Sequence, residues 1–208
     1  MRIIKPGFEF ITPIRGDVIL KRLEQCGRAC YKSEGKITDD SAPDFVRRII
    51  ASGHEAVLEH CAFTVKFICD RGVSHEIVRH RLASYCQEST RYCNYSKGDF
   101  GGEITVIEPC YLHYGSKAYD EWEYACQRAE LAYFNMLNLG LTPQEARAVL
   151  PNSLKTEVVM TANIREWRHF FKLRCSPKAH PQMREIAIQL LQAVKEAIPV
   201  CFDDIKEE

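Results

Sequence analysis

The segment VRHRLASYCQESTRY, residues 78–92, is the most unusual stretch of the chain. Apolar spacing just before it predicts a helix over residues 71–82. On such a helix Arg79 and Arg81 would point about 200° apart, since each residue turns the helix by about 100°. The two guanidinium groups could therefore address two different anionic groups.

The second half of the segment, residues 83–92, is polar and predicts a loop. Gln87, Ser89 and Arg91 alternate along it and could point in one direction. An amide, a hydroxyl and a guanidinium on one side are donors that suit a phosphate monoester and the edge of a pyrimidine. The competing interpretation is a solvated surface with ion pairs, because arginine is commonly exposed.

Outward from this segment, helices and strands are mixed without regular βαβ alternation. Upstream, the patterns predict a strand over 3–11, a helix from 17 to 26, a helix from 41 to 53 and a strand over 61–69. Downstream, they predict a strand at 106–107, helices over 116–139 and 142–150, a strand over 156–161, and helices over 163–174 and 182–197. We therefore expect an α+β fold in a single domain over residues 1–208.

Composition narrows the class of protein. The chain has 208 residues, with 28 Lys and Arg against 28 Asp and Glu, so a general nucleic-acid coat is not expected. We see no signal peptide and no apolar run near the roughly 20 residues that span a bilayer, so we expect no membrane partner and a cytoplasmic protein. The 10 cysteines lack metal-site spacing, and we expect most of them to be buried and reduced.

The signature within residues 78–92 resembles that of a known family. Arg79-His80-Arg81, followed by seven residues and Ser89, is similar to the motif of flavin-dependent thymidylate synthases. The neighbouring residues that also look like this family are Ser84, Gln87, Arg91 and Tyr92. The resemblance runs from Gly53 to the last helix. It implies mixed helices with a small antiparallel sheet, and a homotetramer whose subunits share active sites.

The resemblance also implies roles for individual residues. The residues it implies for FAD are His54, Arg79, His80, Arg81, Gln87, Asn163, Arg165, His169 and His180. Those it implies for dUMP are Glu76, Arg79, Gln87, Glu88, Ser89, Thr90, Arg91, Arg147 and Arg174. Arg174 would also be catalytic, by polarising the uracil ring. Taken singly, Asn163 could be a helix N-cap, Arg147 and Arg165 surface residues, and His180 a loop residue.

The implied activity is methylation of dUMP to dTMP, without a nucleophile supplied by the protein. Methylenetetrahydrofolate would supply the carbon, and FAD reduced by NADPH would supply the hydride. A related uridine nucleotide such as UMP remains an alternative substrate, and NADH an alternative reductant. Two positions depart from the family pattern: Ala56 replaces a hydroxyl residue, and Glu76 replaces a glutamine.

Three other interpretations compete with this one. His54-Glu55 with His60 suggests zinc, but the HExxH pattern needs a histidine at 58, where the chain has Leu58; we expect no metal. A synthase that uses a thiolate as nucleophile could use Cys86 or Cys93, which lie in or next to residues 78–92. A nucleic-acid-binding module could use the arginines and tyrosines at 79–95, although the zero net charge disfavours it.

Overall fold

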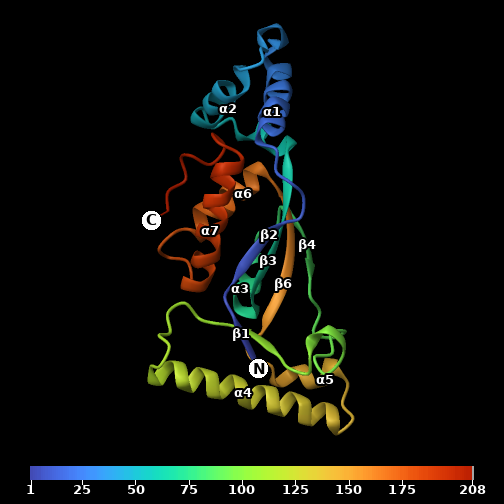
Figure 1. The fold of residues 1–208 in the computed structure, drawn as a ribbon. Coiled ribbons are helices and arrows are strands. Elements are labelled where there is room, and N and C mark those ends of the chain that lie inside the picture. Colours follow the sequence, from blue (N-terminus) through green and yellow to red (C-terminus); the bar gives the residue numbers. More distant parts are fainter. Residues whose placement is uncertain (208) are drawn as a thin grey trace. The chain divides into compact units, whose positions relative to one another are not determined.

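A four-stranded sheet with the order β2-β3-β6-β4 runs through the structure, which is a computed structural model describing residues 1–207 except the side chain of Asp99. Its strands are β2 (Gly7–Phe10), β3 (Ala62–Asp70), β4 (Ala83–Gln87) and β6 (Lys155–Asn163) (Figure 1). The N–H of Ile164 donates to Cys61 O at 2.9 Å, and the N–H of Arg71 donates to Leu154 O at 3.1 Å. Residue numbers rise along β3 as they fall along β6, so the expected antiparallel sheet is confirmed.

Strand β3 shows why this part of the chain is extended. Phe63, Val65 and Phe67 are buried while the residues between them are half-buried, as the alternation in the sequence predicts for a strand with one face in the core. The strand expected over 3–11 is wrong as a single element. Pro6, which has no N–H to donate, separates β1 (Arg2–Ile4) from β2, and β1 pairs in parallel with β5 (Thr105–Ile107) in a second sheet.

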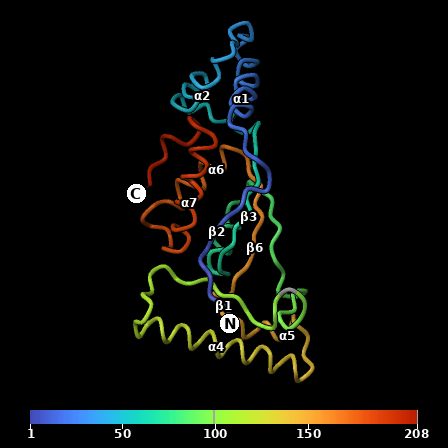
Figure 2. Tube along the Cα trace, in the orientation of Figure 1, coloured from blue at the N-terminus to red at the C-terminus, as the bar shows by residue number. Residues whose placement is uncertain are grey.

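The chain forms two compact units, and four of the five boundaries between them fall inside strands. The first unit comprises Met1–Phe8, Lys66–Arg79 and Tyr85–Val159, and the second unit comprises Glu9–Val65, His80–Ser84 and Met160–Glu208. The single domain over 1–208 stays a prediction, and residue 208 itself lies outside the described residues. Figure 2 traces the backbone through both units.

Within the described residues, the second unit contains four helices and a dense aromatic core beside one of them. The helices are α1 (Gly16–Tyr31), α2 (Ser41–Ala51), α6 (Ile164–Arg174) and α7 (Pro181–Ala197), with the 3-10 turns η1 (Glu34–Lys36) and η2 (Glu55–His60). Trp167 of α6 stacks on Phe63 with ring centroids 4.8 Å apart, and its Nε1 donates to Phe63 O at 3.2 Å. Asn163 caps α6, since its Oδ1 accepts from the N–H of Glu166 at 2.9 Å. The core and the cap together fix the face that α6 presents.

Helices of the first unit surround a separate core. They are α3 (Arg71–Ile77), α4 (Lys117–Asn138) and α5 (Pro143–Ala146), with the 3-10 turns η3 (Gly98–Phe100) and η4 (Arg147–Val149). Tyr133 of α4 packs with Val106, Cys126 and Leu154 in this core. Helix α5 starts where the sequence predicts, and the structure shows a capping box at Thr142. This short helix places Arg147 of η4 beside Thr90.

The helix expected over 71–82 and the loop expected over 83–92 are both corrected. Helix α3 ends at Ile77, whose carbonyl accepts a hydrogen bond from the Tyr85 hydroxyl at 3.0 Å. Residues 83–87 form β4, because a polar segment can still pair with an edge of the sheet when every second residue is half-buried. Arg79 and Arg81 therefore do not lie on a helix, and the argument from helix faces does not apply to them.

Two further expectations concern the whole chain. Among the residues that the structure describes, no helix is long and apolar enough to cross a membrane. All 10 cysteines are free, and those that are buried are Cys61, Cys69, Cys126, Cys175 and Cys201. Half of the cysteines are therefore buried, whereas we expected most of them to be. Cys86 is exposed and Cys93 is half-buried, so both are accessible enough to consider as nucleophiles.

Candidate functional site

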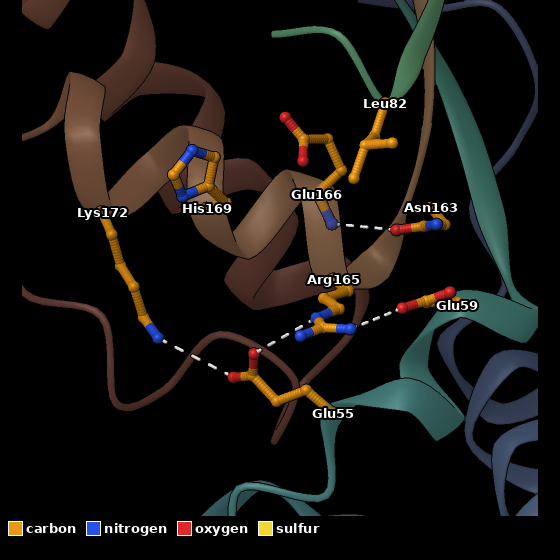
Figure 3. A pocket seen from close by; sticks show the side chains of 8 residues that line it. All are labelled: Glu55, Glu59, Leu82, Asn163, Arg165, Glu166, His169 and Lys172. Atoms are coloured by element: carbon orange, nitrogen blue, oxygen red, sulfur yellow. Dashed lines mark hydrogen bonds and ion pairs between the residues drawn. The ribbon is translucent and has the colours of Figure 1, made fainter.

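A cavity of about 700 Å³ opens on the second unit beside α6 (Figure 3). The residues that line it are Glu55, Glu59, Leu82, Asn163, Arg165, Glu166, His169 and Lys172. Arg165 Nη1 donates to Glu59 Oε1 at 2.6 Å, so this arginine already has an acidic partner across the cavity. Three of the residues expected to hold FAD thus line one cavity, and the volume suits part of a cofactor.

His80 lies beside this cavity and is 4% exposed. Its Nδ1 is 3.1 Å from Glu166 Oε1, and its Nε2 accepts from Arg174 Nε at 3.1 Å. Burial lowers the pKa of His80 from its usual value, an effect that the hydrogen bond to Glu166 opposes. The ring is therefore neutral near pH 7. An arginine can only donate, so Nε2 must be the acceptor and Nδ1 must carry the proton that goes to Glu166.

The ring of His169 lies close to the same group, with its centroid 5.6 Å from that of His80. Ligand atoms of His80, Glu166 and His169 come within 4.8 Å of one another, which is a spacing that a metal ion could use. Both ring nitrogens of His80 already take part in hydrogen bonds, and the cationic Arg174 donates to one of them. The group is therefore better suited to hold Arg174 than to bind a cation.

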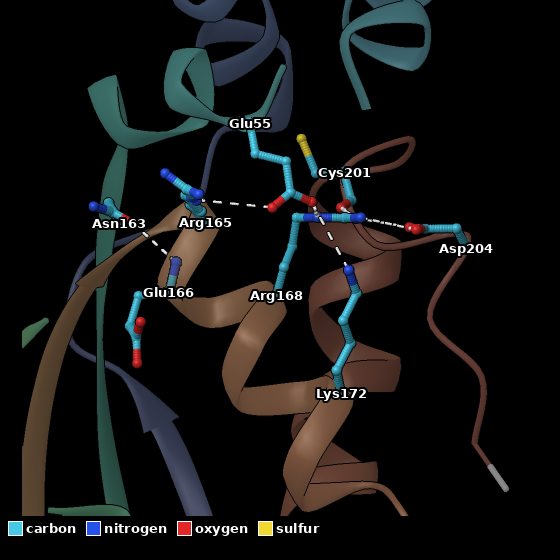
Figure 4. A network of polar contacts seen from close by, with 8 residues as sticks. All are labelled: Glu55, Asn163, Arg165, Glu166, Arg168, Lys172, Cys201 and Asp204. Carbon is cyan, nitrogen blue, oxygen red and sulfur yellow. Dashed lines mark hydrogen bonds and ion pairs between the residues drawn. The ribbon is translucent and has the colours of Figure 1, made fainter. Parts of the chain in front are cut away.

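A second polar network adjoins this cavity and shares Glu55 and Lys172 with it (Figure 4). Arg168 is 2% exposed, and it donates from Nη1 and Nη2 to the two oxygens of Asp204, at 2.7 and 2.8 Å. Its Nε lies 3.4 Å from Glu55 Oε1, and the same carboxylate is 3.8 Å from Lys172 Nζ. Arg168 thus ties α6 to η2 and to the C-terminal segment, which keeps the lining of the cavity in place.

We expect Arg168→Met to lower the free energy of unfolding by roughly 2–3 kcal/mol, measured by urea denaturation. The value is below the roughly 3–5 kcal/mol typical of a fully buried pair because the side chain of Asp204 is 48% exposed. The matched control is Arg47→Met, whose exposed pair with Asp44 should contribute less than about 1 kcal/mol.

The pH dependence of this effect has a definite sign. Hydrogen bonds from Arg168 hold the pKa of Asp204 below its usual value, so their contribution is present above that value and is lost as the pH falls through the lowered pKa. The stability difference between the wild type and Arg168→Met should therefore shrink on acidification from about pH 6 to about pH 2. A difference that stays constant over this range would contradict the Asp204 assignment.

On the first unit, a smaller cavity of about 240 Å³ contains two of the residues expected to bind the nucleotide, Thr90 and Arg147. Arg147 Nη1 donates to Thr90 Oγ1 at 3.2 Å, which links η4 to the end of the signature segment. Arg71 and His75 of α3 also line this cavity. Two arginines, a histidine and a hydroxyl around a small hollow are a chemistry that suits a phosphate.

The residues between β4 and this cavity are held mainly by hydrogen bonds of the first unit. Gln87 Nε2 donates to Ser74 Oγ at 3.0 Å, and the backbone N–H of Glu88 donates to Glu157 O at 2.9 Å. The N–H of Arg91 donates to Ser89 Oγ at 3.3 Å. The N–H of Tyr92 donates to Ser89 O at 3.1 Å, so the backbone turns after Ser89. The expected alternation of Gln87, Ser89 and Arg91 therefore does not continue to Arg91.

Several residues expected in the sites lie elsewhere or have other partners. The carboxylate of Glu88 accepts from Lys155 Nζ at 2.9 Å and from the Tyr95 hydroxyl at 3.1 Å, and it lines a different cavity. His54 Nδ1 is 2.9 Å from the Tyr31 hydroxyl, in a hollow beside α2. His180 is exposed at the start of α7.

The three remaining site residues lie in the sequence within α3 or shortly after it. Arg79 is exposed and belongs to the first unit, and Arg81 is exposed and belongs to the second unit. Glu76 is half-buried in α3. The boundary between the two units thus passes through the Arg79-His80-Arg81 triplet.

Sequence reasoning missed several residues that line these cavities. Glu166 stands three residues after the N-cap Asn163 and three before His169, and this helical spacing could have indicated a shared face. Arg71 and His75 are four residues apart on α3 and lie on one side of it for the same reason. The spacing was readable, but nothing in the sequence shows that an acid such as Glu166 is buried.

The thiolate alternative finds little support in the first unit. Burial raises the pKa of the Cys93 thiol, and the nearby charge of Glu88 adds to the effect. A raised pKa leaves less thiolate at neutral pH, which is the opposite of what a nucleophilic cysteine needs. Cys86 is exposed on β4.

Comparison with known proteins places the chain in a family. A family model described as "Thymidylate synthase complementing protein" matches residues 19–200. The chain belongs to this family. A relative from Geobacter sulfurreducens named "Flavin-dependent thymidylate synthase" is 35% identical over 184 residues, which cover 85% of this chain and 78% of the relative. A protein of the same name from Corynebacterium glutamicum is 32% identical over 218 residues, covering 96% and 84%.

Solved structures agree with this assignment at the level of the fold. The UMP/dUMP methylase PolB from Streptomyces cacaoi, bound with 5-Br dUMP, superposes with a TM-score of 0.78 over 98% of this chain and 96% of that chain. Sequence identity is 21%, so this likeness supports the fold alone. The resemblance to flavin-dependent thymidylate synthases is confirmed, and with it the class of enzyme and the expected α+β fold.

Proposed function

We propose that the protein methylates dUMP to dTMP, with methylenetetrahydrofolate as carbon donor and FAD, reduced by NADPH, as hydride donor. The observation that carries the proposal is how the signature divides between the units. His80 and Arg81 belong to the second unit, which has the larger cavity, whereas Ser89, Thr90 and Arg91 belong to the first unit with the cavity of Arg147. One short segment thus contributes to two anion-binding regions of different size.

The cavity beside α6 fits part of FAD by its donor set. Asn163, Arg165, His169 and Lys172 offer an amide, two cations and an imidazole, and Leu82 offers an apolar contact. Arg165 is balanced by Glu59, so further positive charge would be needed for the diphosphate. Arg81 is exposed, and no ion pair to it is recorded among residues 1–207. When bound, FAD would supply the hydride chemistry that no side chain can provide.

In the first unit, we propose that the cavity lined by Arg71 and Arg147 receives the phosphate of the nucleotide. Thr90 and Arg147 are joined by a hydrogen bond, so the guanidinium is already oriented. Ser89 and the exposed Arg91 would complete the contacts. Arginine suits this role because it stays charged and donates in a fork.

We propose that the protein supplies no nucleophile. Ser89 Oγ accepts from the N–H of Arg91, and no histidine or carboxylate is recorded within hydrogen-bonding reach of this hydroxyl in the described residues. A serine without a base is a weak nucleophile. Arg174, oriented by His80, would stabilise the negative charge that develops on the uracil carbonyl during the reaction.

The remaining parts of the proposal concern assembly and cellular context. We propose a homotetramer in the cytoplasm. The cavity beside α6 measures about 700 Å³. FAD, dUMP and folate bound together would need more concave surface than this, which neighbouring subunits could supply.

We expect the purified protein to be yellow and to bind about one FAD per chain, through Arg81, Asn163, Arg165 and His169. Absorbance near 450 nm, compared with protein concentration, measures this ratio. A colourless protein that takes up no added FAD would refute the flavin assignment.

The function is tested by incubating the protein with FAD, NADPH, methylenetetrahydrofolate and either dUMP or UMP. Mass analysis of the nucleotide should show one added methyl group on dUMP. A methyl group on UMP alone would replace the proposed substrate with the alternative one, and an unchanged mass for both would refute the methylation.

A further inference from the structure

Glu166 is a buried acid that no part of the proposed reaction uses. It is 6% exposed, and its carboxylate contributes both to the cavity beside α6 and to the hydrogen bond with His80. Burying a carboxylate is costly unless a partner compensates it. The Glu166 carboxylate therefore needs a hydrogen-bond donor, and the side chain that supplies it is His80.

We infer that Glu166 is a positioning residue for Arg174, acting through the tautomer of His80. The inference rests on the proposed function, in which Arg174 contacts the uracil ring. Glu166 accepts the Nδ1 proton of His80, which leaves Nε2 as an acceptor for Arg174 Nε. The three side chains form one chain of hydrogen bonds that leads from the proposed flavin cavity to the proposed catalytic guanidinium.

A neutral imidazole has two tautomers, and only the form with the proton on Nδ1 can accept from an arginine at Nε2. In the other tautomer, the N–H of Nε2 would face the N–H of Arg174 Nε, 3.1 Å away. Such an approach of two donors would push the arginine away, so selection of the tautomer determines where the guanidinium lies.

Beside Nδ1, the carboxylate of Glu166 favours the same tautomer that lets Nε2 accept from Arg174. The ring packs against Phe170 with centroids 5.0 Å apart and against His169 at 5.6 Å. These ring contacts hold the imidazole in place but do not choose which nitrogen is protonated. An ionised carboxylate can only accept, so it holds the proton on Nδ1. This is the same physical logic by which an acid orients a catalytic histidine in other enzymes.

The experiment compares Glu166→Gln with Glu166→Leu. Glutamine keeps an oxygen that can accept from Nδ1, whereas leucine has a similar size and cannot accept. The matched control is Glu196→Gln, which makes the same chemical change on the exposed side of α7, outside both proposed sites. Ring nitrogen shifts of His80, from long-range proton–nitrogen NMR spectra of the protein without substrates, report the tautomer directly. The His80→Phe variant assigns the signal.

In the wild type and in Glu166→Gln we expect His80 to be protonated on Nδ1. In Glu166→Leu the Nε2–H form should become populated, and kcat for dUMP should fall about ten- to a hundredfold while KM changes little. Glu166→Gln should keep most of the turnover. Circular dichroism and FAD binding of each variant, compared with Glu196→Gln, identify any general loss of structure.

Unchanged ring nitrogen shifts in Glu166→Leu would overturn the inference, as would equal losses of kcat in the glutamine and leucine variants. The NMR measurement needs neither FAD nor dUMP. If the wild type did not methylate dUMP, the proposed function would fail, while the nitrogen shifts would still decide whether Glu166 sets the tautomer of His80.

Discussion

Arg174→Ala is expected to lower the turnover of dUMP methylation by about a hundredfold or more, even at saturating dUMP. The reason is that a positioned cation is needed where negative charge develops, and such a donor contributes more to the transition state than to binding. His80 Nε2 fixes the Nε of this arginine at 3.1 Å, so the guanidinium is oriented before the substrate arrives. Initial rates at several dUMP concentrations separate kcat from KM.

The matched control for this prediction is Arg22→Ala, which removes an exposed arginine of α1 in the same unit and outside the cavities. FAD content should be similar in both variants. An Arg174→Ala variant with normal kcat and a raised KM would show that the residue only helps to bind the nucleotide.

Arg91→Ala is expected to weaken dUMP binding about ten- to a hundredfold while FAD binding changes little. Loss of a charge-assisted contact to phosphate typically costs about 1.5–3 kcal/mol, which corresponds to this range. In the structure the Arg91 guanidinium lies over the Tyr92 ring, 5.4 Å from its centroid, and the residue is exposed. Titration calorimetry with dUMP measures the change.

Arg128→Ala is the matched control, because Arg128 is an exposed arginine of α4 in the same unit. It should leave the affinity for dUMP unchanged. Equal affinities of the wild type and Arg91→Ala would remove Arg91 from the phosphate site and would leave Arg147 and Arg71 as its cations.

Much of the fold could be predicted from local patterns. The alternation of Phe63, Val65 and Phe67 indicated β3 correctly, and Thr142-Pro143 indicated the start of α5. These signals are short in range. Successive side chains of a strand point to opposite faces of the sheet, and a capping box spans only four residues. Signals of this kind can be read without knowledge of distant parts of the chain.

The errors arose where distant contacts decide the structure. Residues 83–87 are polar and read as a loop, yet they pair with the sheet as β4. The apolar spacing of 71–82 continues past Ile77. The helix α3 nevertheless ends there, and the Ile77 carbonyl accepts a hydrogen bond from the Tyr85 hydroxyl. Tertiary contacts of this kind override local propensity and leave no local pattern to read.

The candidate site was predictable in its arginines but not in its acids. Arg147 and Arg165 stand out because the resemblance to the family implies roles for them, and both line cavities. Glu59 and Glu166 oppose or orient these cations, but in the sequence they look like ordinary surface acids. The burial of Glu166 and the partners of both acids depend on the packing of α6, so only the structure identifies them.

The central claim is that the flavin, and not the folate, supplies the hydride for the new methyl group. The most direct test is a single turnover without oxygen and without NADPH, using protein whose FAD has been reduced chemically. After dUMP and methylenetetrahydrofolate are added, flavin absorbance and dTMP are followed together. The account predicts about one dTMP formed for each flavin reoxidised, with tetrahydrofolate as the other product. Formation of dTMP with dihydrofolate, while the flavin stays reduced, would contradict it.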